Sequence, residues 1–172
     1  MKMLFPVEAF AAIETPFYYY DVELLQATLD TVKREAARYE GFHVHYAIKA
    51  NFNPRLLEII SKAGIGADCV SGGEVRAALS AGVPADKVVF AGVGKTDKEI
   101  AFSLDAGIFC FNVESVPEIE AIERLAAERG VVAQVAVRVT PNVGAHTHAN
   151  ITTGLAENKF GVNYEQLDEV ID

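Results

Sequence analysis

Residues 66–82 read GADCVSGGEVRAALSAG, and they contain every part of a unit that recurs along the chain. A short apolar run, 66–70, is followed by Ser71 and, three residues later, by Glu74, which is the pattern of a capping box at the start of a helix. An apolar-periodic stretch then leads to Gly82, and glycine after a helix favours the left-handed backbone that ends it. The unit therefore predicts a strand, a capped helix and a turn, in that order.

The same unit can be followed in both directions from this stretch. Thr96 with Glu99 and Ser115 with Glu118 have the same cap spacing, and Asn53 precedes a proline, which is favoured at the first helical position. A glycine follows each predicted helix: Gly41, Gly64, Gly82, Gly107 and Gly130. We predict strands at 43–49, 66–70, 87–91, 108–112 and 131–139. We predict helices at 22–40, 54–63, 72–81, 97–106 and 116–129.

Strands that alternate with helices of this length predict right-handed crossovers and a parallel sheet. In the first strand His43, His45, Ala47 and Lys49 share one face, opposite Val44, Tyr46 and Ile48, and in the last strand Gln134, Ala136 and Arg138 share a face. One polar face and one apolar face favour a barrel with a polar interior over an open sheet that is covered by helices on both sides.

The fold class that we predict is therefore α/β, an incomplete (β/α)8 barrel with five of its eight strands, because a closed barrel needs about 250 residues. The run 16–21 is strand-like and precedes the first long helix, and we assign it to a different, second β domain. The predicted division is thus residues 1–20, with a strand of the second domain, and residues 21–172, a partial barrel.

Composition narrows the function classes. Of the 172 residues, 51% are hydrophobic, and 15 basic against 24 acidic residues give a net charge of −9. This balance argues against disorder and against nucleic acid as a partner. We find no run of about 20 apolar residues that would span a membrane and no signal peptide. Cys69 and Cys110 lie in predicted strands and are expected to be buried thiols rather than a disulfide, so the expected location is the cytoplasm.

Polar side chains at the carboxyl ends of the strands are the candidate site, because ligands bind there in parallel α/β folds. Lys49, Asp68 and Arg138 lie at such ends. A buried lysine amine at the mouth of a barrel is a nucleophile suited to a Schiff base with a carbonyl, including the aldehyde of pyridoxal phosphate. The alternative is a lysine that extends from a strand end into solvent, and the pattern alone leaves both open.

Two other motifs are weaker. Residues 92–96, GVGKT, resemble a phosphate loop, but the motif needs a glycine where Val89 stands. The pairs His43/His45 and His146/His148 lack a third metal ligand at a matching spacing, so we predict no metal site. His148 lies in a loop after the fifth strand, where functional residues are frequent. The glutamates of the three caps are assigned no role in catalysis.

An ordered set of motifs gives the chain a family resemblance. YAIKAN at 46–51, DCVSGGE at 68–74, NVES at 112–115 and RVTP at 138–141 resemble the alanine-racemase-like, pyridoxal-phosphate-dependent decarboxylases of fold type III. THANITTG at 147–154 and KFG at 159–161 are similar to the branch of that family that acts on diaminopimelate. The resemblance extends in order from about residue 15 to the end.

This resemblance implies an enzyme of lysine biosynthesis that decarboxylates meso-diaminopimelate to L-lysine. Lys49 would hold the cofactor, pyridoxal 5′-phosphate, as a Schiff base, Arg138 would lie beside it, and Asp68 would be a partner of the lysine. His148 would lie on a loop over the active site. The resemblance also implies a homodimer, and it implies that later family motifs, including the phosphate loop, lie outside these residues, so that we expect little activity from the chain alone.

Two alternatives stay open from the sequence. A related decarboxylase would act on ornithine, arginine or carboxynorspermidine, since the segment that selects substrate is not among these residues. A non-catalytic module that carries pyridoxal phosphate, or that associates with other chains through open strand edges, is the alternative from another class.

Overall fold

A computed structural model of the chain describes residues 5–140, 160–164 and 167. Five strands form one parallel sheet in the order in which they occur in the chain. They are β1 (His45–Ala47), β2 (Gly66–Cys69), β3 (Val88–Phe90), β4 (Cys110–Val113) and β5 (Val135–Val137). Each crossover contains one α-helix: α3 (Pro54–Lys62), α4 (Gly72–Ser80), α5 (Asp97–Ala106) and α6 (Val116–Arg129). The predicted strand and helix order is thus confirmed.

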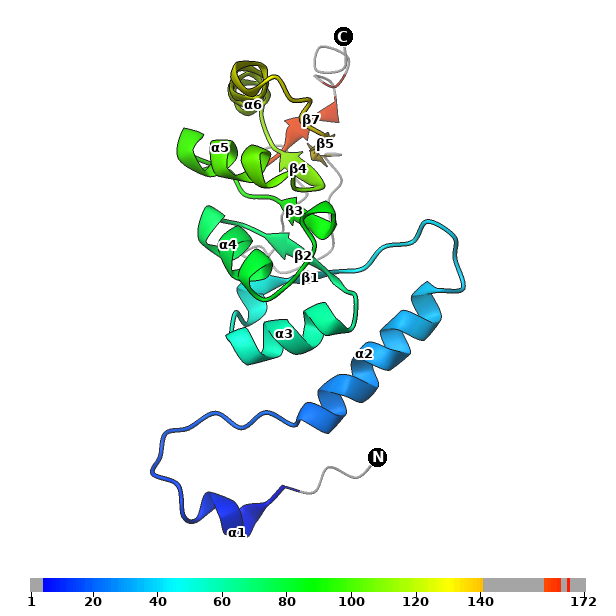
Figure 1. Cartoon of the computed structure of the whole chain (residues 1–172), viewed down its shortest axis with the longest axis vertical. Helices are drawn as coiled ribbons and strands as arrows, with labels where there is room; N and C mark the ends of the chain where they lie inside the picture. Colours follow the sequence, from blue (N-terminus) through cyan, green and yellow to red (C-terminus); the bar gives the residue numbers. More distant parts are fainter. Residues whose placement is uncertain (1–4, 141–159, 165–166, 168–172) are drawn as a thin grey trace.

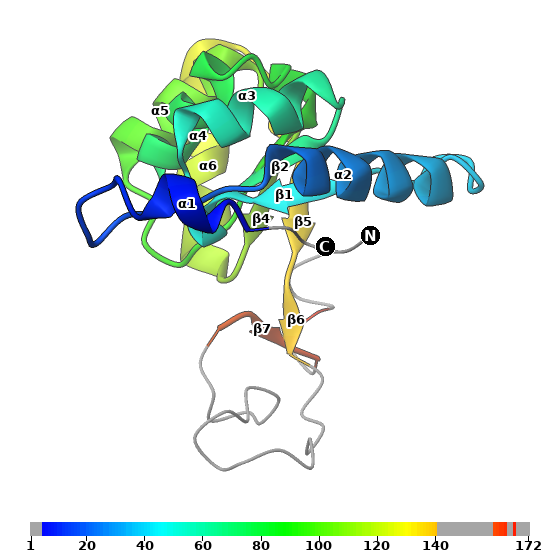
Figure 2. The ribbon, with the colours of Figure 1, turned by 90° about the horizontal axis from the view of Figure 1, so that it is seen from below.

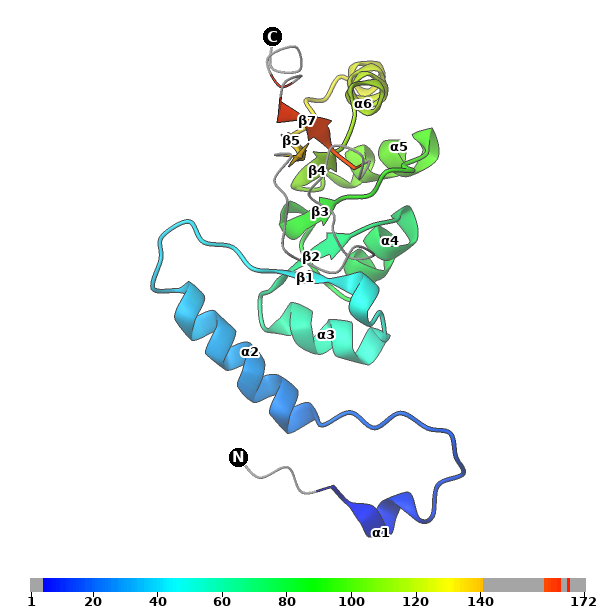
Figure 3. The same ribbon diagram turned by 180° about the vertical axis from the view of Figure 1, so that it is seen from behind.

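The four crossover helices cover a single face of the sheet (Figures 1 and 3). A sheet in chain order with its crossover helices on one face is an arc of a (β/α) barrel, whereas an open doubly wound sheet has helices on both faces. Within the described residues β1 and β5 form the two edges of this arc. The structure therefore confirms an incomplete barrel.

Side-chain alternation separates two environments across the sheet. The face toward the helices is apolar and forms the main core with residues of α3 to α6. From the strands this core takes Ala67, Cys69, Val88, Phe90, Phe111 and Val113. From the helices it takes Leu57, Val75, Ala78, Ile100, Ile122 and Leu125. The opposite face carries Asp68 and Asn112, which alternate with these core residues. Cys69 and Cys110 are buried free thiols, as expected, and burial raises the pKa of Cys69 to about 12.

The N-terminal part consists of α1 (Val7–Phe10) and α2 (Val22–Ala36), joined by an irregular segment. Leu29 of α2 packs with Ile60, Ala63 and Ile65 beside α3. The strand predicted at 16–21 is not formed, because this segment has no strand partner among the described residues. None of the described helices has both the length and the apolar character that crossing a membrane requires.

The last predicted strand, 131–139, is wrong as a single element. The strand begins only at Val135: the Val131 N–H still caps α6 by donating to the Ala126 carbonyl after the left-handed Gly130, and the Gln134 carbonyl makes the first bond to β4 by accepting from Phe111. Beyond β5, β6 (Val139–Thr140) pairs instead with β7 (Val162–Asn163) in a separate two-stranded sheet, apart from the main one in Figure 2. Likewise the first strand ends at Ala47, and 48–50 form one turn of 3-10 helix.

The helix caps follow the sequence in part. Thr96 and Glu99 form the complete capping box, and Asn53 caps α3. Ser71 accepts the Glu74 N–H, but the Glu74 carboxylate accepts the Val70 N–H instead of closing the box. Ser115 makes no side-chain cap bond. The carboxylate of its expected partner, Glu118, accepts from the Lys95 ammonium and the Glu114 N–H instead. The assignment of Glu118 to a cap alone is therefore wrong.

Glu99 caps two helices at once. One carboxylate oxygen accepts the Thr96 N–H at 3.0 Å, and the other accepts the N–H of Gly72, the first residue of α4, at 2.8 Å. A side chain at Gly72 would place its Cβ 2.5 Å from the Glu99 side chain, so glycine is what permits this approach. These bonds, with that from the Thr96 amide foremost, hold the pKa of Glu99 below its ordinary value of 4.5.

We expect Glu99→Gln to lower the free energy of unfolding by about 1 kcal/mol at pH 7, as for the loss of a helix cap. Because the folded-state pKa is depressed, the carboxylate stabilises fully above its ordinary pKa, and this contribution is lost as pH falls below 4.5. Urea unfolding from pH 7 to pH 3 measures it, with the exposed Glu120→Gln as control. An undiminished difference at pH 3 would contradict the assignment.

Candidate functional site

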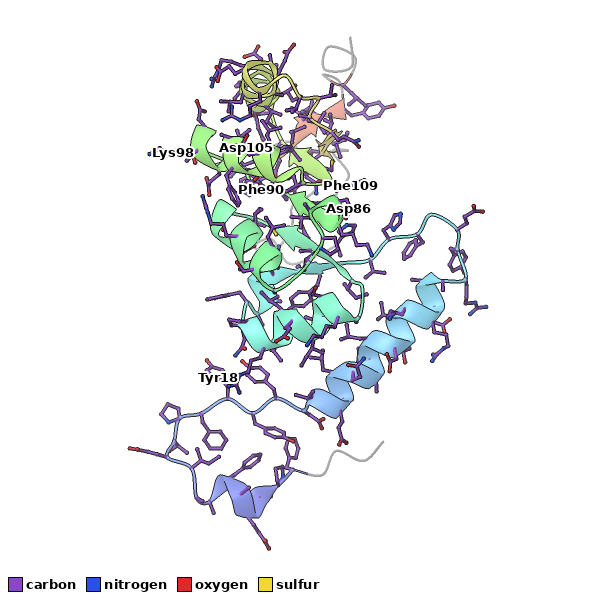
Figure 4. All side chains as sticks on the ribbon, viewed as in Figure 1. Tyr18, Asp86, Phe90, Lys98, Asp105 and Phe109 are labelled. Carbon is purple, nitrogen blue, oxygen red and sulfur yellow. The ribbon has the colours of Figure 1, made fainter. Side chains whose placement is uncertain are left out.

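A cleft of about 510 Å³ opens at the carboxyl edge of the sheet. Its polar lining comes from the ends of four strands: Lys49, Asp68, Asn112, Glu114 and Arg138. Figure 4 marks the opposite edge, where Asp86 and Phe109 lie together at the amino ends of β3 and β4. The structure thus brings three of the four predicted site residues, Lys49, Asp68 and Arg138, to one cleft. His148 lies outside the described residues.

Lys49 reaches the cleft from the 3-10 turn that follows β1. Ile48, fully buried, anchors this turn in the core, and the next residue is exposed toward the cleft. The Tyr46 hydroxyl donates to the backbone carbonyl of Asn51 at 3.1 Å, and the side-chain amide of Asn51 donates to the Tyr20 hydroxyl at 3.0 Å. Burial raises the pKa of Tyr46, so its hydroxyl remains a donor. These bonds fix the backbone on both sides of Lys49.

Asp68 lies on the inner face of β2, level with Ala47 of β1 and Val89 of β3. Its Oδ1 is buried and has no hydrogen-bond partner within the described part of the chain. A buried carboxylate oxygen without a partner destabilises the fold. The Asp68 side chain lines the same cleft as Lys49. The same carboxylate acts on His45, whose pKa burial lowers and Asp68 partly restores.

Arg138 lies where the chain leaves one sheet and enters the other. Its N–H donates to the Val113 carbonyl of β4, and its own carbonyl accepts the Val162 N–H of β7. Its guanidinium donates to the nearly buried Glu114 carboxylate at 3.2 Å, while half of the side chain stays exposed in the cleft. Arg138 therefore presents a positive charge to any ligand there.

The residue that sequence reasoning missed is Lys95. Its side chain is 1% exposed, and the ammonium donates to the carbonyls of Gly92 and Asn112 at 2.8 and 2.9 Å and to the Glu118 carboxylate. The GVGKT stretch is thus no phosphate loop, as predicted, because its lysine is directed into the protein. The sequence contains no local sign of this burial, because the partner of Lys95, Glu118, lies 23 residues away. The position of Glu118 three residues after Ser115 instead indicated a helix cap.

The described residues contain no cluster of three histidine, cysteine or acidic side chains that would hold a metal ion. What they do contain is an amine, a guanidinium and a carboxylate around an open cleft. Such a set suits an anionic carbonyl compound, which the amine binds covalently and the guanidinium attracts. Fold and site together place a lysine, a carboxylate and an arginine at the carboxyl edge of a (β/α)-barrel arc.

Comparison with known proteins identifies the family of the chain. Residues 25–172 match the family model of the pyridoxal-dependent decarboxylase pyridoxal-binding domain, and the chain therefore belongs to that family. It is 60% identical to the diaminopimelate decarboxylase of Bacteroides thetaiotaomicron over 100% of its length and 45% of that protein. It is 42% identical to the diaminopimelate decarboxylase of Helicobacter pylori over 95% of the chain and 40% of that protein.

Solved structures agree. The crystal structure of Helicobacter pylori diaminopimelate decarboxylase complexed with L-lysine superposes with a TM-score of 0.85 at 40% identity, over 95% of this chain and 41% of that one. An arginine decarboxylase of Paramecium bursaria Chlorella virus, 22% identical with a TM-score of 0.68 over 85% of this chain and 37% of that one, shares the fold. The chain spans less than half the length of the curated relatives that it matches.

We expect Tyr46→Phe to loosen the Lys49 turn, because the Asn51 carbonyl loses its donor. The free energy of unfolding should fall by about 1 kcal/mol. The backbone N–H of Asn51, which donates to the Ile48 carbonyl, should exchange its hydrogen faster. Urea unfolding and amide exchange measure both, with Tyr39→Phe on an exposed ring as control. Equal behaviour of the two variants would show that the hydroxyl does not hold the turn.

Proposed function

We propose that this chain is the pyridoxal-binding part of an enzyme that decarboxylates meso-diaminopimelate to L-lysine. The observation that carries the proposal is the convergence of Lys49, Asp68 and Arg138 on one cleft at the carboxyl edge of the barrel arc. The substrate is supported by the identity of 60% to a relative named diaminopimelate decarboxylase. The arginine decarboxylase structure is 22% identical and supports only the fold.

The residues of the cleft fit pyridoxal 5′-phosphate. The Lys49 amine is exposed to the cleft and suits the aldehyde, and the Arg138 guanidinium suits an anionic group of the same molecule. The unpartnered Asp68 oxygen supplies an acceptor on the side of the lysine. When bound, the cofactor supplies the electron sink for the bond that breaks as carbon dioxide leaves.

The chain's own residues have distinct roles in this proposal. Lys49 would hold the cofactor through its amine, and the same amine, when free, would take up or give back a proton near the reacting carbon. Asp68 orients that amine, and Arg138 balances negative charge in the cleft. His148 stays a predicted catalytic residue of the loop at 142–154. A homodimer, a cytoplasmic location and a second β domain that includes residues 1–20 complete the proposal.

Covalent capture tests the cofactor site directly. After incubation with pyridoxal phosphate and reduction with borohydride, we expect one modified peptide, which contains Lys49, because its amine opens on the cleft. Lys49→Ala should abolish this product, and Lys62→Ala, which removes an exposed lysine of α3, should leave it unchanged. Modification of a different lysine would contradict the assignment.

Carbon dioxide release tests the substrate. In the longer protein to which we assign this chain, meso-diaminopimelate should be decarboxylated and ornithine and arginine should not, and Lys49→Ala should reduce release to the background. Faster turnover of ornithine or arginine would favour the related decarboxylases. Adduct formation without release from any of the three would favour a non-catalytic carrier. Release by the 172 residues alone would contradict the view that the site needs further residues.

A further inference from the structure

The wall of the cleft is held from behind by a buried cation. The Lys95 ammonium lies 5.2 Å from the centre of the Phe90 ring and donates to two carbonyls, one at the end of β3 and one on β4. The two residues that supply these carbonyls, Gly92 and Asn112, both line the cleft. The third acceptor is Glu118 in the first turn of α6, so one side chain ties three segments together.

Glu118 continues this connection toward the cleft. One of its carboxylate oxygens binds Lys95, and the other accepts the Glu114 N–H at 3.0 Å. The Glu114 carboxylate, in turn, accepts from the Arg138 guanidinium at 3.2 Å. A continuous series of hydrogen bonds therefore connects the buried Lys95 ammonium with the Arg138 guanidinium. Of these two cations, Arg138 is the one that lines the open cleft.

We propose that Lys95 and Glu118 are positioning residues of this site, which hold Glu114, and through it Arg138, in the place from which the guanidinium meets an anionic ligand. The identity of that ligand as pyridoxal phosphate rests on the proposed function. The bonds themselves do not, because they join residues of the chain alone.

The charges of the pair explain why the arrangement is specific. A buried ammonium requires a buried carboxylate, and a carboxylate has two acceptor oxygens, which here serve two different donors. A glutamine at position 118 has one acceptor oxygen and one donor group. It therefore leaves either the Lys95 charge without a carboxylate or the Glu114 N–H without its acceptor, and both changes loosen the segment that positions the Glu114 carboxylate against Arg138.

The first experiment measures the anchor without any ligand. Phenylglyoxal labels arginine side chains, and a guanidinium held by a carboxylate reacts slowly. In Glu118→Gln we expect the labelling rate of Arg138, relative to the exposed Arg55 of α3, to rise about three- to tenfold, the factor for one lost hydrogen bond. Glu58→Gln removes an exposed ion pair with Lys62 and should leave the ratio unchanged.

Glu118→Asp is the second variant, and it carries the measurement if Glu118→Gln does not fold. An aspartate keeps the charge beside Lys95 but is shorter by one methylene, so it does not span both donors. It should raise the labelling of Arg138 in the same way. An unchanged labelling ratio in the folded variants would overturn the proposal, whatever the protein binds.

The second experiment connects the anchor to the site through a double-mutant cycle. Glu118→Gln and Arg138→Gln should each weaken binding of pyridoxal phosphate about three- to tenfold, and the double variant should bind no more weakly than Arg138→Gln alone. Equal weakening by Glu118→Gln with and without Arg138 would indicate a purely structural effect and overturn the proposal. Failure of the unchanged chain to form the Lys49 adduct would contradict the proposed function instead, and the labelling result would still decide this inference.

Discussion

The parallel hydrogen-bonded register of the five strands is the constraint on which the rest of this structure depends. Because all strands run in one direction, their carboxyl ends meet at one edge, and residues distant in sequence become neighbours there. Asp68 lies level with Ala47, and Asn112 lies level with Ala136. Each crossover helix must then return along the same face, which buries one side of every strand and leaves the other side for the cleft.

This division assigns different chemistry to the two faces. The face toward the helices is filled by apolar side chains such as Phe90 and Ile100, and it needs no polar partner. The inner face carries charged groups, which are costly to bury unless they are paired or bind a ligand. Glu114 and Arg138 are paired with each other, whereas Asp68 keeps an unpartnered oxygen in the described structure. The cleft therefore combines a rigid, satisfied side with a side suited to a ligand.

Fold likeness and sequence identity support different statements about function. A decarboxylase named for arginine shares this fold at 22% identity, so the barrel arc alone does not distinguish substrates. In the proposed function, Lys49, Asp68 and Arg138 are the residues that would hold a pyridoxal cofactor. The choice of diaminopimelate rests on relatives at 60% and 42% identity, of which this chain covers less than half.

Local features of the fold were predictable from the sequence because their causes lie within a few residues. The Thr96 capping box, the cap at Asn53 and the left-handed glycines 41, 64, 82, 107 and 130 all form as expected. Alternation along the strands also predicted that Lys49 and Arg138 face one interior. The run at 16–21 forms no strand among the described residues, because a strand requires a partner that local pattern does not supply.

What only the tertiary structure decided is the choice of partners between distant segments. Glu99 accepts from Gly72 across 27 residues, and Lys95 pairs with Glu118 across 23. Arg138 lies at a break between two sheets where the pattern indicated one continuous strand. The sequence by itself determined the order of strands and helices and several of the helix caps, since those signals are short-range. It did not determine which buried charges meet, because that depends on the packing of helices and strand ends that are distant in the chain.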